Sequence, residues 1–424
     1  MEVKNNFERR TLNGFEIMRW LVLPLSAFLL WVSLGPFGAW VVGDPAKDPF
    51  RVLPRAITVD PLDYRWPYYL AQAYWGMGKR REAKSYFSKS LRLNPLDSVV
   101  WSSLADLCLD EGRKEDALLA LKNAASLDPS SAFIQWRVLV RLLSLDLPSA
   151  RGIAQELVSR LLILEPSKRR NLFALGEMLV GGGGMEKLLP RDEGVWRAYL
   201  RWLISRGEVE RAMVVWREMG EWGWKDRRLF RGVVDGLIAR GAVAQAWEVW
   251  REEFPQDPFI HNGGFERDLL GFGFGWRFNS RISGLKSWGF ACREKVEGRR
   301  SLYLEFDGEH NPQVSWPRQL VYVGTPGTYR LSAYVRTEGV TGATGFSLSV
   351  WGKGFRAQCR ELRGYNPWRW VQVEFQVQEP GPCWVALVRR ATRKLNRFLG
   401  GKVWIDQVVL ERLDEEGVSQ GNPG

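Results

Sequence analysis

Histidine and cysteine are scarce in this sequence. Its 424 residues include two histidines, His261 and His310, and four cysteines. No two cysteines have the C-x-x-C spacing of zinc and redox sites, and four are too few for a disulfide-stabilised scaffold. Two histidines are few for a histidine-based metal or catalytic centre. At most one disulfide is expected, among the three cysteines of the last third: Cys292, Cys359 and Cys383.

Catalytic motifs are also lacking. The chain contains no Gly-x-Ser-x-Gly, His-Glu-x-x-His, phosphate-binding loop or dinucleotide fingerprint. The run from Gly181 to Gly184 is not followed by Gly-Lys-Ser/Thr, so it predicts a break between helices. Glu305, Asp307 and Glu309 are neighbouring carboxylates, but two side chains in one short strand do not define an acid and a base on opposite sides of a bond. We therefore expect a protein that is not an enzyme; an enzyme of unfamiliar type is kept only as a third alternative.

The charge is unevenly distributed. The formal net charge is +12, and residues 259–413 hold 23 Lys and Arg against 13 Asp and Glu. A polyanionic partner is one explanation, and a basic surface that only keeps the protein soluble is the other. With 45% hydrophobic and 25% charged residues the composition is globular, and the length allows two or three folded units.

One long uncharged segment lies near the N-terminus, from Trp20 to Gly43. At ~1.5 Å per residue a helix of this length covers the ~30 Å core of a bilayer. Basic residues precede this segment, whereas the residues that follow it include both acidic and basic side chains. The positive-inside rule therefore predicts a cytoplasmic tail over 1–16, a transmembrane helix over 17–43 and a periplasmic remainder, in a single-pass protein of the bacterial inner membrane. A cleaved signal peptide is the alternative, but the segment lacks a small-x-small cleavage pattern.

Residues 44–258 carry an internal repeat. Prolines recur every 34 residues at Pro61, Pro95 and Pro129, and the same interval separates four pairs of small residues: Gly78 and Gly112, Ala83 and Ala117, Gly207 and Gly241, Ala212 and Ala246. Small residues let two antiparallel helices pack closely, and proline ends the second helix because it cannot continue the hydrogen-bond ladder.

The order Leu70, Ala71, Tyr74, Ala83, Phe87, Pro95 resembles the tetratricopeptide repeat signature. This resemblance implies an all-α solenoid that binds protein partners and does not catalyse. We expect the tryptophans of the region to lie in its core: Trp101, Trp196, Trp216 and Trp250.

After residue 258 the pattern changes to short alternating runs between glycine- and proline-rich turns, typical of strands. It predicts an antiparallel β-sandwich over 259–413, followed by a disordered tail over 414–424. The apolar phase is assigned to the core between the two sheets. It comprises Leu302, Leu304, Phe306, Leu331, Ala333, Val335, Phe346, Leu348, Val350, Val371, Val373 and Phe375.

This region also resembles the jelly-roll carbohydrate-binding modules of secreted cellulases and xylanases. The likeness rests on motifs that follow the order of that family: Asn262-Gly263-Gly264-Phe265-Glu266, Gly275-Trp276, Gly298 with Ser301-Leu302, Pro326-Gly327-Thr328-Tyr329, Trp368 and Val403-Trp404-Ile405-Asp406. It implies a jelly-roll fold and a polysaccharide ligand. Fold alone does not establish sugar binding.

The outward phase of the strands supplies the candidate carbohydrate site: Tyr303, Tyr334, Arg336, Trp351, Trp370 and Gln372. A pyranose stacks its C–H face on an aromatic ring, and its hydroxyls need hydrogen-bond partners. Alternatively, these rings cover one another or dock against the repeats.

A structural calcium ion is implied by the same resemblance, with Glu266 and Asp406 as ligands, because carboxylate oxygens suit Ca²⁺. The alternative is that Asp406 caps a turn or pairs with an arginine. No other cofactor is expected.

A basic run departs from the family pattern and is a candidate anion site for phosphate, uronate or anionic lipid: Arg389, Arg390, Arg393, Lys394 and Arg397. It is otherwise a solvated loop. Nucleic acid is not an expected partner, because the predicted topology places this domain outside the cytoplasm.

Together these patterns predict a membrane-anchored, non-catalytic scaffold. Its repeats would recruit proteins, and its sandwich would bind a polysaccharide, with anionic polysaccharides among the candidates, as an accessory in cell-envelope or exopolysaccharide assembly or export. The alternative is a pure protein-interaction scaffold whose sandwich is structural and binds no sugar.

Overall fold

The computed structural model describes residues 48–145, 147–181, 184–257 and 259–413. The predicted tail over 1–16, transmembrane helix over 17–43 and tail over 414–424 lie outside these ranges. Within the described ranges, no helix is both long and apolar enough to cross a bilayer. The chain divides into two compact units, the first ending at Val195 and the second beginning at Trp196.

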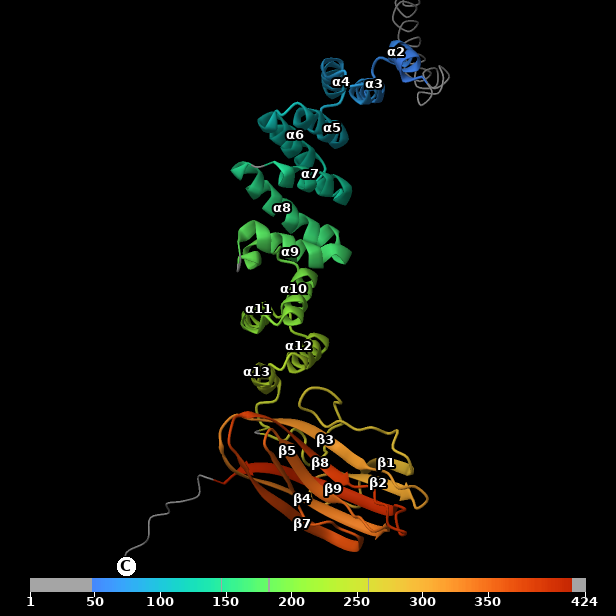
Figure 1. Ribbon diagram of the computed structural model, residues 1–424, viewed down its shortest axis with the longest axis vertical. Coiled ribbons are helices and arrows are strands. Elements are labelled where there is room, and N and C mark those ends of the chain that lie inside the picture. Colours follow the sequence, from blue (N-terminus) through green and yellow to red (C-terminus); the bar gives the residue numbers. More distant parts are fainter. Residues whose placement is uncertain (1–47, 146, 182–183, 258, 414–424) are drawn as a thin grey trace, which may run out of the picture. The chain divides into compact units, whose positions relative to one another are not determined.

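The first unit is built from short helices, coloured blue to green in Figure 1. Neighbouring helices pack as pairs, α3 with α4, α5 with α6 and α7 with α8. The helices are α2 (Pro49–Val59), α3 (Arg65–Gly76), α4 (Arg80–Leu93), α5 (Ser98–Asp110), α6 (Lys114–Leu127), α7 (Ala132–Ser144), α8 (Pro148–Leu164) and α9 (Arg169–Val180), with 3₁₀ turns at Pro166–Lys168 and Met185–Leu188.

The repeated glycines end the first helix of their pairs. Gly78, Gly112, Gly207 and Gly241 have φ of +75°, +74°, +79° and +79°. After α3 the Gly78 N–H donates to the carbonyl of residue 75 at 2.8 Å, and the next N–H reaches the carbonyl of residue 74 at 2.9 Å. Such left-handed caps favour glycine because it has no Cβ. The 34-residue spacing of the glycines thus reports a recurring backbone conformation.

The repeated alanines lie inside the helix pairs. Ala71, Ala83, Ala105 and Ala117 have no exposed surface, and Ala212 and Ala246 are equally buried. Three of the four tryptophans predicted for the core are buried: Trp196, Trp216 and Trp250. The fourth, Trp101, is half-buried and donates its indole N–H to the carbonyl of Pro95 at 2.8 Å.

The second unit combines helices with two antiparallel sheets. Its helices are α10 (Glu193–Arg206), which begins in the first unit, α11 (Val209–Glu221), α12 (Arg227–Ala239) and α13 (Val243–Glu253). One sheet has the order β1 (Leu285–Ala291), β2 (Ser301–Asp307), β9 (Gly400–Arg412), β4 (Gly327–Val340), β7 (Gly364–Val377). The other has the order β3 (Val314–Val323), β8 (Gly381–Arg389), β5 (Ser347–Gly352), β6 (Phe355–Gln358).

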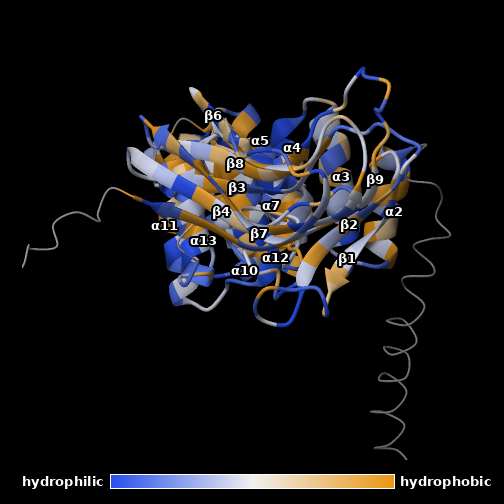
Figure 2. Cartoon of the chain, turned by 90° about the horizontal axis from the view of Figure 1, so that it is seen from below, coloured by the Kyte–Doolittle hydropathy of each residue, from blue (hydrophilic) through white to orange (hydrophobic). Residues whose placement is uncertain are grey.

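A single hydrophobic core joins the two sheets. All twelve residues of the predicted apolar phase belong to this core or, for Val373, pack against it. Hydrophobic and hydrophilic colours alternate along the strands in Figure 2, as expected when successive side chains point to opposite faces. The prediction of helical repeats followed by an antiparallel β domain is therefore confirmed.

The last helix pair packs onto the four-stranded sheet through an aromatic cluster. The Trp250 ring of α13 lies 5.8 Å from both Phe272 and Phe274, centroid to centroid, and Trp247 lies 5.0 Å from Phe274. Between these phenylalanines the backbone passes so close that a Cβ on Gly273 would stand 2.7 Å from the Trp250 ring. Helix α13 also contacts β3 and β8 (Figure 1).

The two strands that α13 contacts, β3 and β8, carry outward residues that are buried. Leu320, Ala386 and Val388 alternate with core residues and so point outward, yet all three are buried. Contact with α13 contributes to this burial, because it excludes water from these two strands.

Candidate functional site

Five of the six residues of the candidate carbohydrate site lie on the five-stranded sheet. Tyr303 is on β2, Tyr334 and Arg336 are on β4, and Trp370 and Gln372 are on β7. Tyr334 and Trp370 are directly opposed in the β4–β7 register. The structure therefore places these two residues opposite each other on neighbouring strands.

The sixth residue, Trp351, was assigned to the wrong surface. It lies on β5 of the four-stranded sheet, where it opposes Trp384 of β8 and Arg356 of β6. The hydrophobic core separates this sheet from Tyr334 and Trp370. Alternation correctly indicated that Trp351 points outward, but it does not reveal to which sheet a strand belongs.

Most rings on the five-stranded sheet are partly covered by neighbours. Trp404 of β9, which sequence reasoning missed as a site residue, lies between Tyr303 and Arg336 in the strand register. Its ring is 5% exposed, and the Arg336 guanidinium stands 5.1 Å from the ring centroid. Trp370, in contrast, is 47% exposed. Among the predicted carbohydrate-site residues, Trp370 is therefore the ring that a ligand can reach over the largest area.

A cavity of about 480 Å³ opens beside Trp370 at the edge strand β7. Three arginines line it together with Trp370 and Gln372: Arg360, Arg363 and Arg369. Glu361 is the carboxylate among its lining residues. The volume falls within the roughly 300–1,000 Å³ usual for ligand sites. An aromatic plane beside several guanidinium groups suits a ligand with an apolar ring face and negative charges.

The basic run contains one residue that is not available to a ligand. Arg389, predicted as part of the anion site, is 1% exposed, and burial lowers the pKa of its guanidinium. It donates to the Asn311 side chain at 2.8 Å and to the carbonyls of Pro312 and Arg397 at 2.6 and 2.8 Å. This part of the prediction is corrected: Arg389 supports the loop, because its Nη1 and Nη2 atoms donate to groups inside the protein.

The other four residues of the run are exposed: Arg390, Arg393, Lys394 and Arg397. They lie in the loop of residues 390–399 that connects β8 to β9. Because these four side chains are exposed, they remain candidates for binding an anion.

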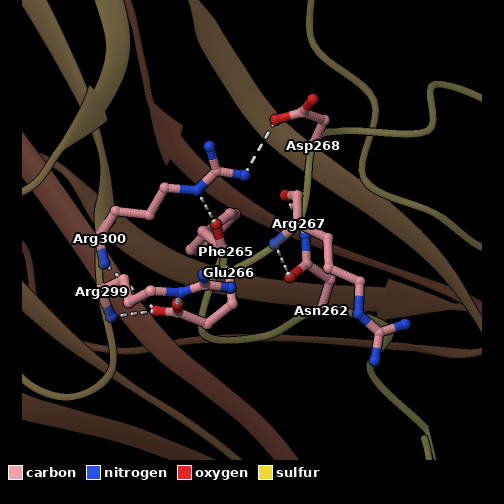
Figure 3. A network of polar contacts seen from close by, with 7 residues as sticks. All are labelled: Asn262, Phe265, Glu266, Arg267, Asp268, Arg299 and Arg300. Carbon is pink, nitrogen blue, oxygen red and sulfur yellow. Dashed lines mark hydrogen bonds and ion pairs between the residues drawn. The ribbon is translucent and has the colours of Figure 1, made fainter.

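Glu266 and Asp406, the predicted calcium ligands, both hold the loop that precedes β2. Glu266 accepts the backbone N–H groups of Arg299 and Arg300 at 2.9 and 3.3 Å, as Figure 3 shows. Asp406 is fully buried and accepts the N–H groups of Val296 and Gln407 at 2.9 and 2.8 Å. Burial raises the pKa of Asp406, and the nearby Glu266 carboxylate raises it further.

These two carboxylates do not form a calcium site by themselves. Ca²⁺ takes six to eight oxygen ligands. Among the described residues, no group of three or more His, Cys, Asp and Glu side chains is placed to hold a metal. The oxygens of Glu266 and Asp406 already accept backbone donors, which is the turn-capping alternative considered for Asp406.

In the first unit, polar contacts link the first helices of successive pairs. The Tyr68 hydroxyl of α3 lies 3.4 Å from the Ser103 hydroxyl of α5. Asp106 of α5 accepts from Arg137 and Arg141 of α7, each at 2.8 Å. The two residues of each of these contacts are 31–35 positions apart in the sequence, which is about one repeat length. Similar positions in successive repeats therefore face one another along the stack.

A cavity of about 640 Å³ lies against α7. Exposed Phe133 and Val140 form part of its wall, which also contains Arg137 and Arg141, both paired with Asp106, and Lys168, paired with Glu165 at 3.3 Å. The Lys168 ammonium stands 5.1 Å from the centroid of Trp136, which also lines the cavity. Apolar surface flanked by charged side chains is suited to a peptide segment that carries both apolar and charged side chains.

Comparison with known proteins supports the repeat region directly. Residues 68–132 match a tetratricopeptide repeat family model. No curated protein matches the chain.

Three solved structures are similar over parts of the chain. One of Naa15/Naa10 bound to HypK-THB has 18% identity, a TM-score of 0.31 and coverage of 51% of this chain and 35% of its own. TmCBM61 in complex with beta-1,4-galactotriose has 19% identity, a TM-score of 0.27 and coverage of 36% and 97%. YrrB, a TPR protein with an unusual peptide-binding site, has 12% identity, a TM-score of 0.24 and coverage of 48% and 93%. This chain thus spans about a third of the first of these proteins.

Proposed function

We propose that this protein is a non-catalytic scaffold that binds an anionic polysaccharide through its β-sandwich and protein partners through its repeats. The observation that carries the sugar-binding part is the cavity at β7. It combines the exposed Trp370 ring with Gln372, Arg360, Arg363 and Arg369. An aromatic ring provides the stacking surface for a sugar, and the arginines select for carboxylate or other acidic substituents.

Retention of the full chain in a gel that contains polysaccharide tests this proposal. Polygalacturonate is the acidic probe, and dextran is the neutral control. We expect wild-type protein to be slowed by polygalacturonate and Trp370→Ala to lose this retardation. Trp351→Ala is the matched control, because it removes an outward tryptophan from the other sheet and should leave retention unchanged. Far-UV circular dichroism checks that both variants are folded.

If Trp370→Ala and wild type migrate alike in polygalacturonate, the sugar site is not at β7. If wild type is not slowed by any polysaccharide, the alternative of a pure protein-interaction scaffold with a structural sandwich is favoured.

The repeats support the protein-binding part of the proposal. The cavity beside α7 and the ladder through Tyr68, Ser103, Asp106 and Arg137 create a fixed surface with both apolar and charged groups. Helical repeats of this kind present such surfaces to extended segments of other proteins.

Membrane anchoring and a periplasmic location complete the proposal, as part of cell-envelope or exopolysaccharide assembly or export. They rest on the uncharged segment from Trp20 to Gly43. A reporter enzyme that is active only outside the cytoplasm, fused to the C-terminus, should be active. Activity only of a cytoplasmic reporter would overturn this topology.

A further inference from the structure

The loop of residues 390–399 is held firmly at its base. Arg389, at the end of β8, is buried and clamps the loop through its bond to the carbonyl of Arg397. The Asn311 side chain donates to the carbonyl of Thr392 at 2.8 Å, and Thr341 donates to that of Phe398 at 3.0 Å. Contacts to two other loops therefore fix the backbone on both sides of the loop's tip.

A leucine lies at the tip of this supported loop. Leu395 is fully exposed, at 102% of the reference area, and Phe398 is 42% exposed. A rigid loop that presents an aliphatic side chain wholly to water has not folded that side chain into any described part of the protein. Single exposed apolar residues are common on protein surfaces, so the neighbours of Leu395 decide its meaning.

Cations surround the leucine. Arg390, Arg393, Lys394 and Arg397 are all exposed in the same ten-residue loop, which contains no Asp or Glu. An acidic turn, bonded to the loop's end through the N–H of Leu399 and the carbonyl of His310, carries Asp307 and Glu309, and the charge of Glu361 acts on Arg389 at the base of the loop. Asp307 is itself paired with His310 at 2.8 Å. Positive charge thus dominates around the apolar tip.

We propose that this loop docks on an anionic lipid bilayer, with Leu395 entering the acyl region and the four cations contacting headgroups. Each Lys or Arg near an anionic surface adds electrostatic attraction, and burial of the leucine side chain adds a hydrophobic contribution. A soluble polyanion complements the positive charge, but it has no apolar region that could bury the leucine side chain. The bilayer is the partner that uses both features. This inference does not depend on the polysaccharide site around Trp370.

A fluorophore at the tip tests the inference in the full chain. Cys292 is the exposed cysteine, whereas Cys108, Cys359 and Cys383 are buried. In a Cys292→Ser background, Leu395→Cys is labelled with the environment-sensitive dye NBD. The protein is then combined with phosphatidylcholine vesicles that contain or lack phosphatidylglycerol. We expect a blue shift and stronger emission only with phosphatidylglycerol, reduced at high salt.

Two controls make the result specific to the loop. Lys353→Cys in the same background places the dye between β5 and β6, at the opposite end of β8, and should report an aqueous environment throughout. Adding Arg393→Ser and Lys394→Ser to the Leu395→Cys protein should abolish the phosphatidylglycerol response without changing its circular dichroism spectrum.

Two results would overturn the inference. One is equal emission from residue 395 with both kinds of vesicle. The other is a blue shift produced by soluble polygalacturonate without lipid, which would assign the loop to a polysaccharide. Neither result depends on whether Trp370 binds sugar, so failure here is distinguishable from failure of the proposed function.

Discussion

The two sheets of the sandwich differ in what covers their outer faces. On the four-stranded sheet the outward residues Leu320, Ala386 and Val388 are buried, and α13 contacts the strands that carry them, β3 and β8. On the five-stranded sheet, the outward residues Trp370 and Val409 are 47% and 43% exposed. Similar strands thus have different surroundings: two strands of one sheet contact the last helix, and the other sheet leaves some of its outward side chains exposed.

Tryptophan–arginine contacts on the two sheets show why residue type alone does not identify a binding site. On the four-stranded sheet, the guanidinium of Arg318 lies 4.0 Å from the ring of Trp316 and 4.7 Å from that of Trp384. Burial lowers the pKa of Arg318, and the charge of Arg277 lowers it further. At the β7 edge, arginines and Trp370 instead line an open cavity. The same residue types pack in one place and remain accessible in the other.

The largest expected difference between the two sheets is in stability. Trp250→Ala removes a fully buried ring that joins α13 to Phe272 and Phe274, and should cost the second unit about 3–5 kcal/mol. Trp370→Ala should cost less than about 1 kcal/mol because its ring is half-exposed. Hydrogen exchange measured by mass spectrometry should show faster exchange in α12, α13, β3 and β8 for the first variant only. Similar exchange in both variants would contradict the comparison.

The next effect concerns the charges beside Trp370. Arg363→Ala combined with Arg369→Ala should weaken retention by polygalacturonate about tenfold, since each exposed charge contact contributes up to about 1 kcal/mol. The loss should be greatest at low ionic strength, because salt screens exposed charges. Arg356→Ala, on β6, is the matched control. Equal weakening by the control variant would assign the effect to overall charge.

Acidification should destabilise the contact between α13 and the four-stranded sheet. Burial lowers the pKa of His261 below its usual 6.5, although Asp257, 2.6 Å away, opposes this shift. The unfolded chain therefore takes up a proton before the folded chain does. Stability from neutral His261 is complete above about pH 6.5 and is lost as pH falls toward the lower folded pKa. Urea unfolding between pH 7.5 and about 5 should show this decline, and His261→Phe should reduce it.

His310→Asn provides the control for that measurement. His310 is the other histidine of the chain and lies exposed beside Asp307. An undiminished pH dependence in His261→Phe would show that other groups cause the decline.

The smallest expected effect is that of metal removal. Because backbone N–H groups already bond Glu266 and Asp406, adding EDTA should leave the melting temperature unchanged. Circular dichroism during heating, with and without EDTA and with added CaCl₂, measures this directly. A rise in melting temperature with CaCl₂ would restore the predicted calcium site.

Much of the fold could be predicted because it depends on local geometry. The spacing of Gly78, Gly112, Gly207 and Gly241 reports left-handed helix caps, and the buried alanines report close helix packing. Strand alternation likewise identified the core, since side chains on a strand must alternate between its faces. The sequence cannot reveal which strand joins which sheet, and for this reason Trp351 was misplaced.

The helix pairs, the strands and the inward or outward direction of most side chains were predictable from the sequence, because these follow from periodicities of 34 and 2 residues and from turn geometry. Three features appeared only in the folded chain: Arg389 is buried while its neighbours are exposed, Trp351 and Trp370 lie on opposite sheets, and α13 contacts β3 and β8. Burial and sheet membership depend on contacts between residues far apart in the chain, which no local pattern records.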